Sequence, residues 1–193
     1  LMYAAKENSN PEVCAVLIKA GADVNARDTN GGSPLVWAVR DNTPEVCAVL
    51  IHVGADVNAR HTNGQSPLMY AAESSNPEVC TVLIKAGAEV NARDNDGGSP
   101  LMSAALLNSN PEVCEALVKA GAEVNARDHD GVSPLMIEAM NNANPAVCAV
   151  LIESGADVNA RNNDGESSLM FAAAFNANPA VCAVLIEAGA DVK

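Results

Sequence analysis

Aromatic side chains and positive charges are both scarce in this chain of 193 residues. One Trp, two Tyr and two Phe make up 3% of the sequence, whereas hydrophobic residues make up 49%. The interior must therefore be built from small aliphatic side chains, and the hydrophobic fraction excludes a disordered chain. Lys and Arg number 11 against 24 Asp and Glu, which gives a formal net charge of −13. Because phosphates are bound by clustered Lys and Arg, this balance argues against nucleic-acid and anionic-membrane partners.

Long apolar runs are also missing. Uninterrupted apolar stretches such as 147–152 fall far short of the ~20 residues that span a bilayer, so we expect no membrane-spanning helix. No secretory signal is visible, although the chain starts at Leu1 in the middle of a motif, which leaves its targeting open.

An internal repeat organises the sequence. Three markers recur with a period of 33 or 34 residues: the cysteines, a Ser-Pro-Leu motif as at 66–68, and a Gly-Ala-Asp/Glu-Val motif as at 87–90. Three markers that share one period predict a stack of repeats. The cysteines are Cys14, Cys47, Cys80, Cys114, Cys148 and Cys182. We place the repeats at about 1–32, 33–65, 66–98, 99–132, 133–166 and 167–193, the first and last incomplete, within a single domain 1–193.

Each repeat predicts two helices and a turn. In the repeat 66–98, Ser66 followed by Pro67 is typical of a helix start, and a short helix is expected over 68–73. Asn76 followed by Pro and Glu begins a second helix, which Gly87 ends. The Asn-, Asp- and Gly-rich segment 88–98 predicts an extended turn or hairpin. One such unit cannot bury its own faces, but stacked units can.

The repeat resembles the ankyrin repeat, in the helix start at 66–72 and in the second-helix and turn sequence at 83–92. The resemblance covers the whole chain and implies an all-α solenoid of paired antiparallel helices with hairpin or turn connections, in six repeats. Glu138 and Ser168 depart from the family pattern, which allows a small residue and Pro there, so we expect locally weaker helices. The units differ in length and sequence, which favours duplicated natural sequence over an engineered array.

The six cysteines are compatible with disulfides, a metal site or a buried core. Equivalent residues of stacked helices lie about 10 Å apart, whereas disulfides need Cα atoms within about 7 Å and metal ligands must converge on one point. We therefore predict that the cysteines lie in the core as small apolar groups. Reduced cysteines in turn predict a reducing compartment, the cytoplasm.

No pattern of catalytic residues is present, so we expect no enzyme activity, cofactor or metal. His52, His61 and His129 lie in different repeats without a nucleophile or acid at a recognisable spacing, and we expect them on the surface. The Asp-rich turns at 94–97 and 128–131 lack the twelfth-position Glu of a calcium loop. An arginine column is expected to form a solvated, charge-balanced ladder of little energetic weight: Arg27, Arg60, Arg93, Arg127 and Arg161.

The aromatic residues point to a binding surface. Four of the five occupy one repeat position, and Phe175 lies one helical turn after Phe171, so we expect that none is left for the core. The family resemblance implies that this position faces a concave groove between the first helices and the hairpins. Aromatic rings and exposed apolar rows are typical of interaction sites, although packing between first helices is the alternative. The candidate partner-binding residues are Tyr3, Trp37, Arg40, Tyr70, Glu73, Ser103, Leu106, Leu107, Ile137, Met140, Phe171 and Phe175.

Three functions are compatible with the sequence. The first is a non-catalytic module that binds another protein on its concave face. The second is a structural unit that associates end to end, because neither end carries the polar cap that repeat arrays need; the alternative is that the natural chain continues. The third is a regulatory segment of a longer enzyme.

Overall fold

The computed structural model describes residues 1–41, 43–74, 76–107, 109–141 and 144–193. Within these ranges the chain forms paired helices, with no strand and one isolated antiparallel bridge between Arg161 and Ser167. The helices are α1 (Met2–Glu7), α2 (Pro11–Lys19), α3 (Pro34–Arg40), α4 (Pro44–His52), α5 (Pro67–Glu73), α6 (Pro77–Lys85), α7 (Pro100–Leu107), α8 (Pro111–Lys119), α9 (Pro134–Asn141), α10 (Pro145–Glu153), α11 (Ser168–Phe175) and α12 (Pro179–Glu187). The prediction of an all-helical solenoid is confirmed.

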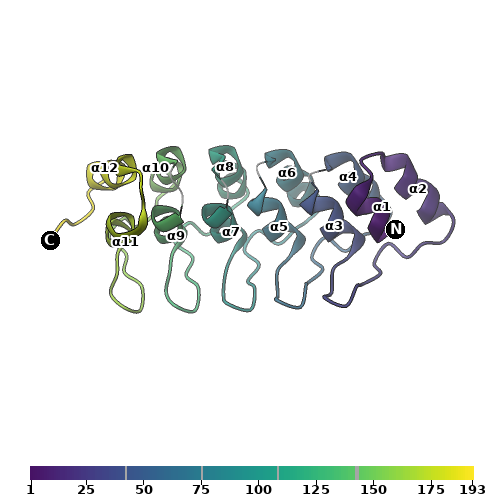
Figure 1. The fold of residues 1–193 in the computed structure, drawn as a ribbon, viewed down its shortest axis with the longest axis horizontal. Coiled ribbons are helices and arrows are strands. Elements are labelled where there is room, and N and C mark those ends of the chain that lie inside the picture. The colour runs from purple at the N-terminus through teal and green to yellow at the C-terminus, as the bar shows by residue number, and fades with distance from the viewer. Residues whose placement is uncertain (42, 75, 108, 142–143) are drawn as a thin grey trace.

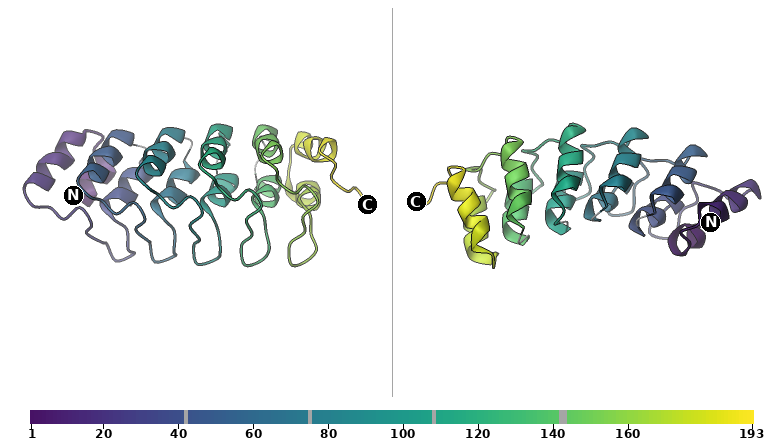
Figure 2. Two further views of the ribbon diagram at one scale, coloured as in Figure 1. Left: turned by 180° about the vertical axis from the view of Figure 1, so that it is seen from behind. Right: turned by 90° about the horizontal axis from the view of Figure 1, so that it is seen from above.

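The helices form two layers with the loops along one side (Figure 1). The odd-numbered first helices of the pairs make one row, and the even-numbered second helices make the other. Each second helix is joined to the next first helix by a long loop, and these loops project past the row of first helices. Figure 2 shows that successive pairs stack in a single file along the chain. The first helices therefore form the middle layer, with one face toward the second helices and one toward the loops.

The predicted caps set the helix bounds. The Ser66 hydroxyl accepts a hydrogen bond from the Met69 backbone N–H at 3.4 Å, and Pro67 follows as the first helical residue. The Asn76 side chain accepts from the backbone N–H of Glu78 at 2.9 Å at the start of α6. Gly87 adopts a φ of 91° just after α6, a left-handed conformation that glycine takes at low cost.

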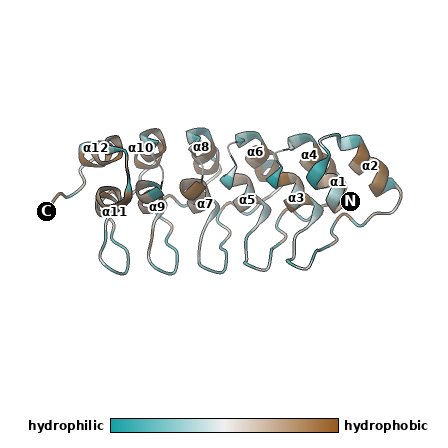
Figure 3. Ribbon diagram, viewed as in Figure 1, coloured by the Kyte–Doolittle hydropathy of each residue, from teal (hydrophilic) through white to brown (hydrophobic). Residues whose placement is uncertain are grey.

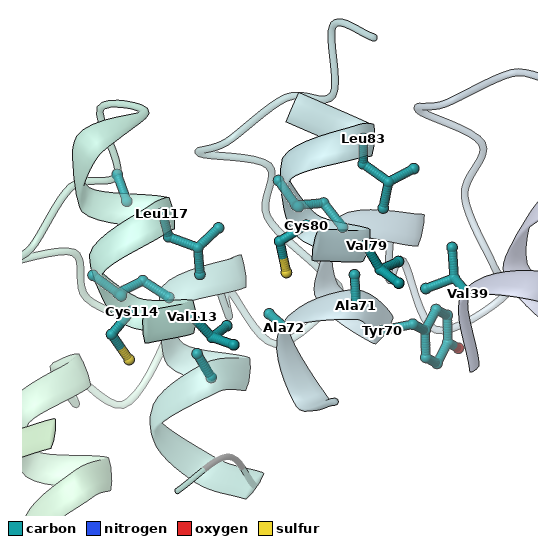
Figure 4. Packing of buried hydrophobic residues seen from close by; sticks show 14 of the residues in the cluster. Val39, Tyr70, Ala71, Ala72, Val79, Cys80, Leu83, Val113, Cys114 and Leu117 are labelled. Atoms are coloured by element: carbon teal, nitrogen blue, oxygen red, sulfur yellow. The ribbon is translucent and has the colours of Figure 1, made fainter. Parts of the chain in front are cut away.

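Small aliphatic side chains and cysteines fill the core between the layers. Val79, Cys80 and Leu83 of α6 are fully buried, and Figure 4 shows this set beside Ala71 and Ala72, with its counterpart repeated on α8. Burying a leucine contributes about 1.5–3 kcal/mol relative to leaving it exposed. In Figure 3 the hydrophobic colour lies on the helices, whereas the loops are pale to hydrophilic. The array is thus held together by similar contacts between neighbours, repeated along its length.

The cysteines are core residues, as predicted. All six are free; five are buried, and Cys182 is half-buried. Burial raises the pKa of the Cys47 and Cys80 thiols to about 12. The same holds for Cys114 and Cys148, where the nearby charge of Glu138 adds to the effect of burial.

Two departures from the family pattern do not prevent helix formation. Glu138 is fully buried within α9, at the position that Ala71 occupies in α5, and α9 still runs from Pro134 to Asn141. Ser168 is the buried first residue of α11, which is capped by the Ser167 hydroxyl. The one-residue difference in length between repeats lies between the start of the first helix and the start of the second, in segments that include positions 75 and 108, outside the described residues.

The arginine column is mostly exposed, as predicted, but it also has a structural role that the sequence did not indicate. One guanidinium nitrogen of Arg60 donates to the carbonyl of Gly64 in its own loop at 2.8 Å and to the carbonyl of Arg93 in the next loop at 2.7 Å. The same pair of bonds is made by Arg27, Arg93 and Arg127. Exposed ion pairs, such as Arg60 with Glu89 at 3.5 Å, add little. Each of these arginines therefore ties its loop to the next one.

A row of asparagines bridges the units in the same way. The side-chain nitrogen of Asn58 donates to the carbonyl of Gly87 at 3.1 Å, and its side-chain oxygen accepts from the backbone N–H of Glu89 at 2.9 Å. Equivalent bridges are made by Asn25, Asn91, Asn125 and Asn159. Backbone bonds between loop tips, such as Thr62 N–H to the Asn30 carbonyl at 3.0 Å, complete the connection. The loops therefore form a continuous wall.

Candidate protein-binding groove

The candidate groove lies between the row of first helices and this wall of loops. Its floor is formed by one equivalent position in each first helix. This position lies four residues after the capping serine where one is present, as Trp37 lies after Ser33, and Tyr3 occupies it in α1. The occupants of this position differ in exposure: Tyr3 is 84% exposed, Tyr70 is 8% exposed, and Trp37 is half-buried. The remaining occupants, all half-buried, are Ser103, Ile137 and Phe171.

A first pocket, of about 260 Å³, lies at the N-terminal end of the groove between α1, α3 and the loop that joins α2 to α3. It is lined by Met2, Tyr3, Lys6, Asp28 and Trp37. The indole N–H of Trp37 donates to the Asp28 carboxylate at 3.1 Å, which fixes the ring against the loop. Although burial opposes ionisation of Asp28, the hydrogen bonds from two loop backbone N–H groups and from Trp37 hold the pKa of this carboxyl below its ordinary value.

Next to this pocket along the groove, cationic side chains lie over aromatic rings. The Arg40 guanidinium lies over two rings, 5.3 Å from the centroid of Trp37 and 5.5 Å from that of Tyr70. Lys6 lies 5.6 Å from the centroid of Trp37, and His61 meets Tyr70 edge-on at 5.9 Å. Such cation–π contacts contribute about 0.5–1 kcal/mol each at exposed sites. The prediction that no aromatic residue is left for the core is wrong at Tyr70, which belongs to the buried cluster, and burial raises the pKa of its hydroxyl.

A second pocket, of about 180 Å³, lies farther along the groove against α5, α7 and α9. Among the predicted residues it brings together Glu73, Ser103, Leu106 and Ile137. Burial raises the pKa of Glu73, while the hydrogen bond from the Gln65 side chain at 3.0 Å and the charge of Arg40 favour its ionised form. The other residues of this pocket are Gln65, Asp94, Asp96, Gly98, Met102 and Asp128.

Apolar side chains also lie on the later first helices α7, α9 and α11. Phe171 and Phe175 contact each other with ring centroids 6.3 Å apart, and Phe175 is 65% exposed. Leu107 at the end of α7 is 62% exposed, and Met140 of α9 is half-buried. Neither of these two residues lines the pockets described above. Exposed apolar groups along one face are more typical of an interaction surface than of a solvated one.

Sequence reasoning missed the acidic wall of the second pocket. The sequence indicates only that Asp94 and Asp128 lie in Asp-rich turns, whereas in the structure the arginines that precede them bond to backbone carbonyls and not to these carboxylates. A sequence signal for this wall does exist, because each aspartate precedes a floor residue of the groove by nine positions. Trp37 follows Asp28, Ser103 follows Asp94 and Ile137 follows Asp128.

The His, Cys, Asp and Glu side chains of the described residues do not form a metal site. No three of these described side chains are placed to hold a metal ion. His52 and His129 are exposed, and His61 packs against Tyr70. Among the described helices, none has the length and apolar character needed to cross a membrane.

Comparison with known families agrees with this architecture. A family model described as ankyrin repeats (3 copies) matches residues 1–94, 61–128 and 101–193, which together cover the chain. No curated protein matches it.

Proposed function

Since this chain belongs to the ankyrin-repeat family, we propose that it is a non-catalytic module that binds a partner protein in the groove between its first helices and its loops. Ankyrin repeats are in general protein–protein interaction modules. The observation that carries the proposal for this face is the exposure of apolar side chains on the first helices, such as Tyr3, Leu106 and Phe175. The proposal places the partner in the cytoplasm, because six free cysteines suit a reducing compartment.

The hydrogen bonds that join neighbouring loops support this function, because they make the surface rigid. A surface that is rigid before binding loses less conformational entropy when it binds. The arginine and asparagine bridges fix the loops relative to one another, and the Asp28–Trp37 bond fixes a ring at the groove floor. The groove is therefore preorganised along the stack.

Site-specific photocrosslinking tests the proposed face. A photoreactive amino acid at Leu106 or Phe175 in the groove should capture the partner in cells that produce the protein. The same amino acid at Lys85, an exposed residue of the second-helix layer, is the matched control. Cross-links from Lys85 but from neither groove position would contradict the proposal.

End-to-end association is a second candidate. Ile186 and Val192 are 49% and 68% exposed, whereas their counterparts Ile84 and Val90 pack partly against the core. A second copy stacked on this face would cover them. Sedimentation velocity should then show a mass that rises with concentration, and a constant monomer mass up to high concentration would exclude this candidate.

A regulatory segment of a longer enzyme is the third candidate, and its test needs the longer chain. Such a segment would change the activity of an adjoining catalytic domain when the groove is occupied. Equal activity with and without a groove-bound partner would exclude it.

A further inference from the structure

The second pocket combines an apolar floor with an acidic wall. Leu106 and Ile137 line it from the helix side, and the carboxylates of Asp94 and Asp128 line it from the loop side. Leu106 is 45% exposed, although it is a large apolar residue. An alkyl chain against the floor and a positive charge at the wall would satisfy both surfaces together. A long basic side chain has this construction, since its apolar stem carries a charged end.

The chain itself contains an example of a donor bound to such a wall carboxylate. Asp28 occupies the same loop position as Asp94 and Asp128. One of its oxygens accepts from the backbone N–H groups of Asn30 and Gly32, both at 2.8 Å. Its other oxygen accepts from the ring N–H of Trp37 at 3.1 Å. A planar N–H donor that reaches this position from the floor is therefore compatible with the loop geometry.

At the second pocket that donor is missing. One oxygen of Asp94 accepts from the backbone of Asp96 at 3.0 Å and of Gly98 at 2.6 Å. Asp128 makes the same two backbone bonds, at 3.0 and 2.8 Å. Ser103 and Ile137 stand where Trp37 stands for Asp28. In the described ranges no donor bonds to the second oxygen of either aspartate, so both remain available to a partner.

The nearby arginines do not neutralise these two carboxylates. The Arg93 guanidinium donates to the carbonyls of Gly97 and Arg127 and pairs with Glu123 at 3.1 Å. Arg127 likewise donates to two carbonyls. Within the residues that the structure covers, neither Asp94 nor Asp128 forms an ion pair. The formal net charge of −13 adds a long-range attraction for positive partners.

We propose that the second pocket binds a basic side chain, arginine in preference to lysine, from a segment of the partner protein. This inference rests on the proposed function, because it names the chemistry of the partner that occupies the groove. The stem of the side chain packs on Leu106 and Ile137, and its guanidinium donates to the free oxygen of one wall aspartate, Asp94 or Asp128, while the charge of the other adds attraction at longer range. Arginine is preferred because its planar guanidinium carries N–H donors in several directions, whereas the lysine ammonium acts as a compact point charge.

The last loop shows which substitution keeps the loop structure. Asn162 occupies the same loop position in the last loop and accepts the same two backbone bonds, at 3.1 and 2.8 Å. The double variant Asp94→Asn, Asp128→Asn should therefore fold with its loops intact. The double variant Asp56→Asn, Asp157→Asn removes the same charge at exposed positions whose carboxylates cap their own turns. It controls for a general loss of negative charge.

The probe is a displayed library of random 12-residue peptides selected on the full chain. We expect the selected peptides to share an arginine, and their Kd to rise about tenfold or more in the pocket variant, because its charge-assisted bonds are lost. We expect a change within about threefold in the control variant. Replacing the peptide arginine with lysine should weaken binding. A peptide with norleucine in place of the arginine should bind the pocket variant and the unsubstituted protein with the same Kd.

The outcomes separate the two proposals. Peptides that lose affinity in the groove variant Phe175→Ser but carry no basic residue would overturn the arginine pocket and leave the groove intact. Equal losses in the pocket and control variants would also overturn it. Peptides that bind without any effect of groove substitutions would contradict the proposed function itself.

Discussion

Replacement of Asn58 by alanine tests whether the asparagine bridges hold the units together. The change removes the bond to the Gly87 carbonyl at 3.1 Å and the bond from the Glu89 N–H at 2.9 Å. A net contribution of about 0.5–1.5 kcal/mol per bond gives a loss of about 1–3 kcal/mol in the free energy of unfolding. Because water can reach both groups after the change, the lower half of this range is expected. Asn58→Asp keeps the acceptor and loses the donor, so it should lose about half as much.

Urea unfolding followed by circular dichroism measures these losses. The control is Asn30→Ala, since Asn30 is an exposed residue of a loop tip whose side chain makes no bond to another unit within the described residues. We expect the control to lose less than about 0.5 kcal/mol, as is usual for surface changes. The reasoning would be refuted if Asn58→Ala were as stable as the control, or if Asn58→Asp matched the unsubstituted protein.

Three further predictions concern the core, the thiols and the loops. Tyr70→Ala should lower the free energy of unfolding by roughly 3 kcal/mol in the same urea assay, whereas Tyr3→Ala should leave it unchanged; equal losses would contradict the burial difference. Burial raises the pKa of Cys114 to about 12, so this thiol stays protonated in the folded protein while it ionises in the unfolded chain above about pH 9. The contribution of the thiol to the free energy of unfolding is therefore complete below pH 9 and is lost as pH rises toward 12. Cys114→Ala should therefore reduce the alkaline slope of unfolding free energy by about 1.4 kcal/mol per pH unit, and an unchanged slope would count against a buried thiol. Gly64 and Gly54 both have positive φ, but a Cβ at Gly64 would lie 2.7 Å from the backbone nitrogen of Asn95, whereas a Cβ at Gly54 would meet no atom within 4 Å. Gly64→Ala should therefore lower the midpoint of thermal unfolding more than Gly54→Ala does. The opposite order would contradict the contacts between loops.

The fold could be predicted from the sequence because its signals are local and repeated. The pair Ser66-Pro67, the cap at Asn76 and the stop at Gly87 act within a few residues, and all three are present in the structure. The burial of Cys80 followed from its recurrence in every repeat, because helices that stack cannot bring equivalent positions within disulfide distance.

The site could be predicted only in part, because its decisive contacts join different units. Tyr70 shares a repeat position with Tyr3, yet one ring is buried and the other exposed. The difference comes from neighbours such as Arg40 and His61, which lie in other helices and loops. The role of the Arg60 side chain also depends on a carbonyl 33 residues away, and no local pattern reveals such a bond.

Equilibrium binding of the photocrosslinked partner tests the central claim most directly. Three exposed apolar residues of the groove are replaced together in the variant Tyr3→Ser, Leu106→Ser, Phe175→Ser. The control replaces three similarly exposed apolar residues outside the groove, Val16→Ser, Val53→Ser, Ile186→Ser. A partner bound in the groove should bind the first variant at least about a hundredfold more weakly and the control within about threefold of the unsubstituted protein. Unchanged binding to the groove variant, with loss in the control, would contradict the account.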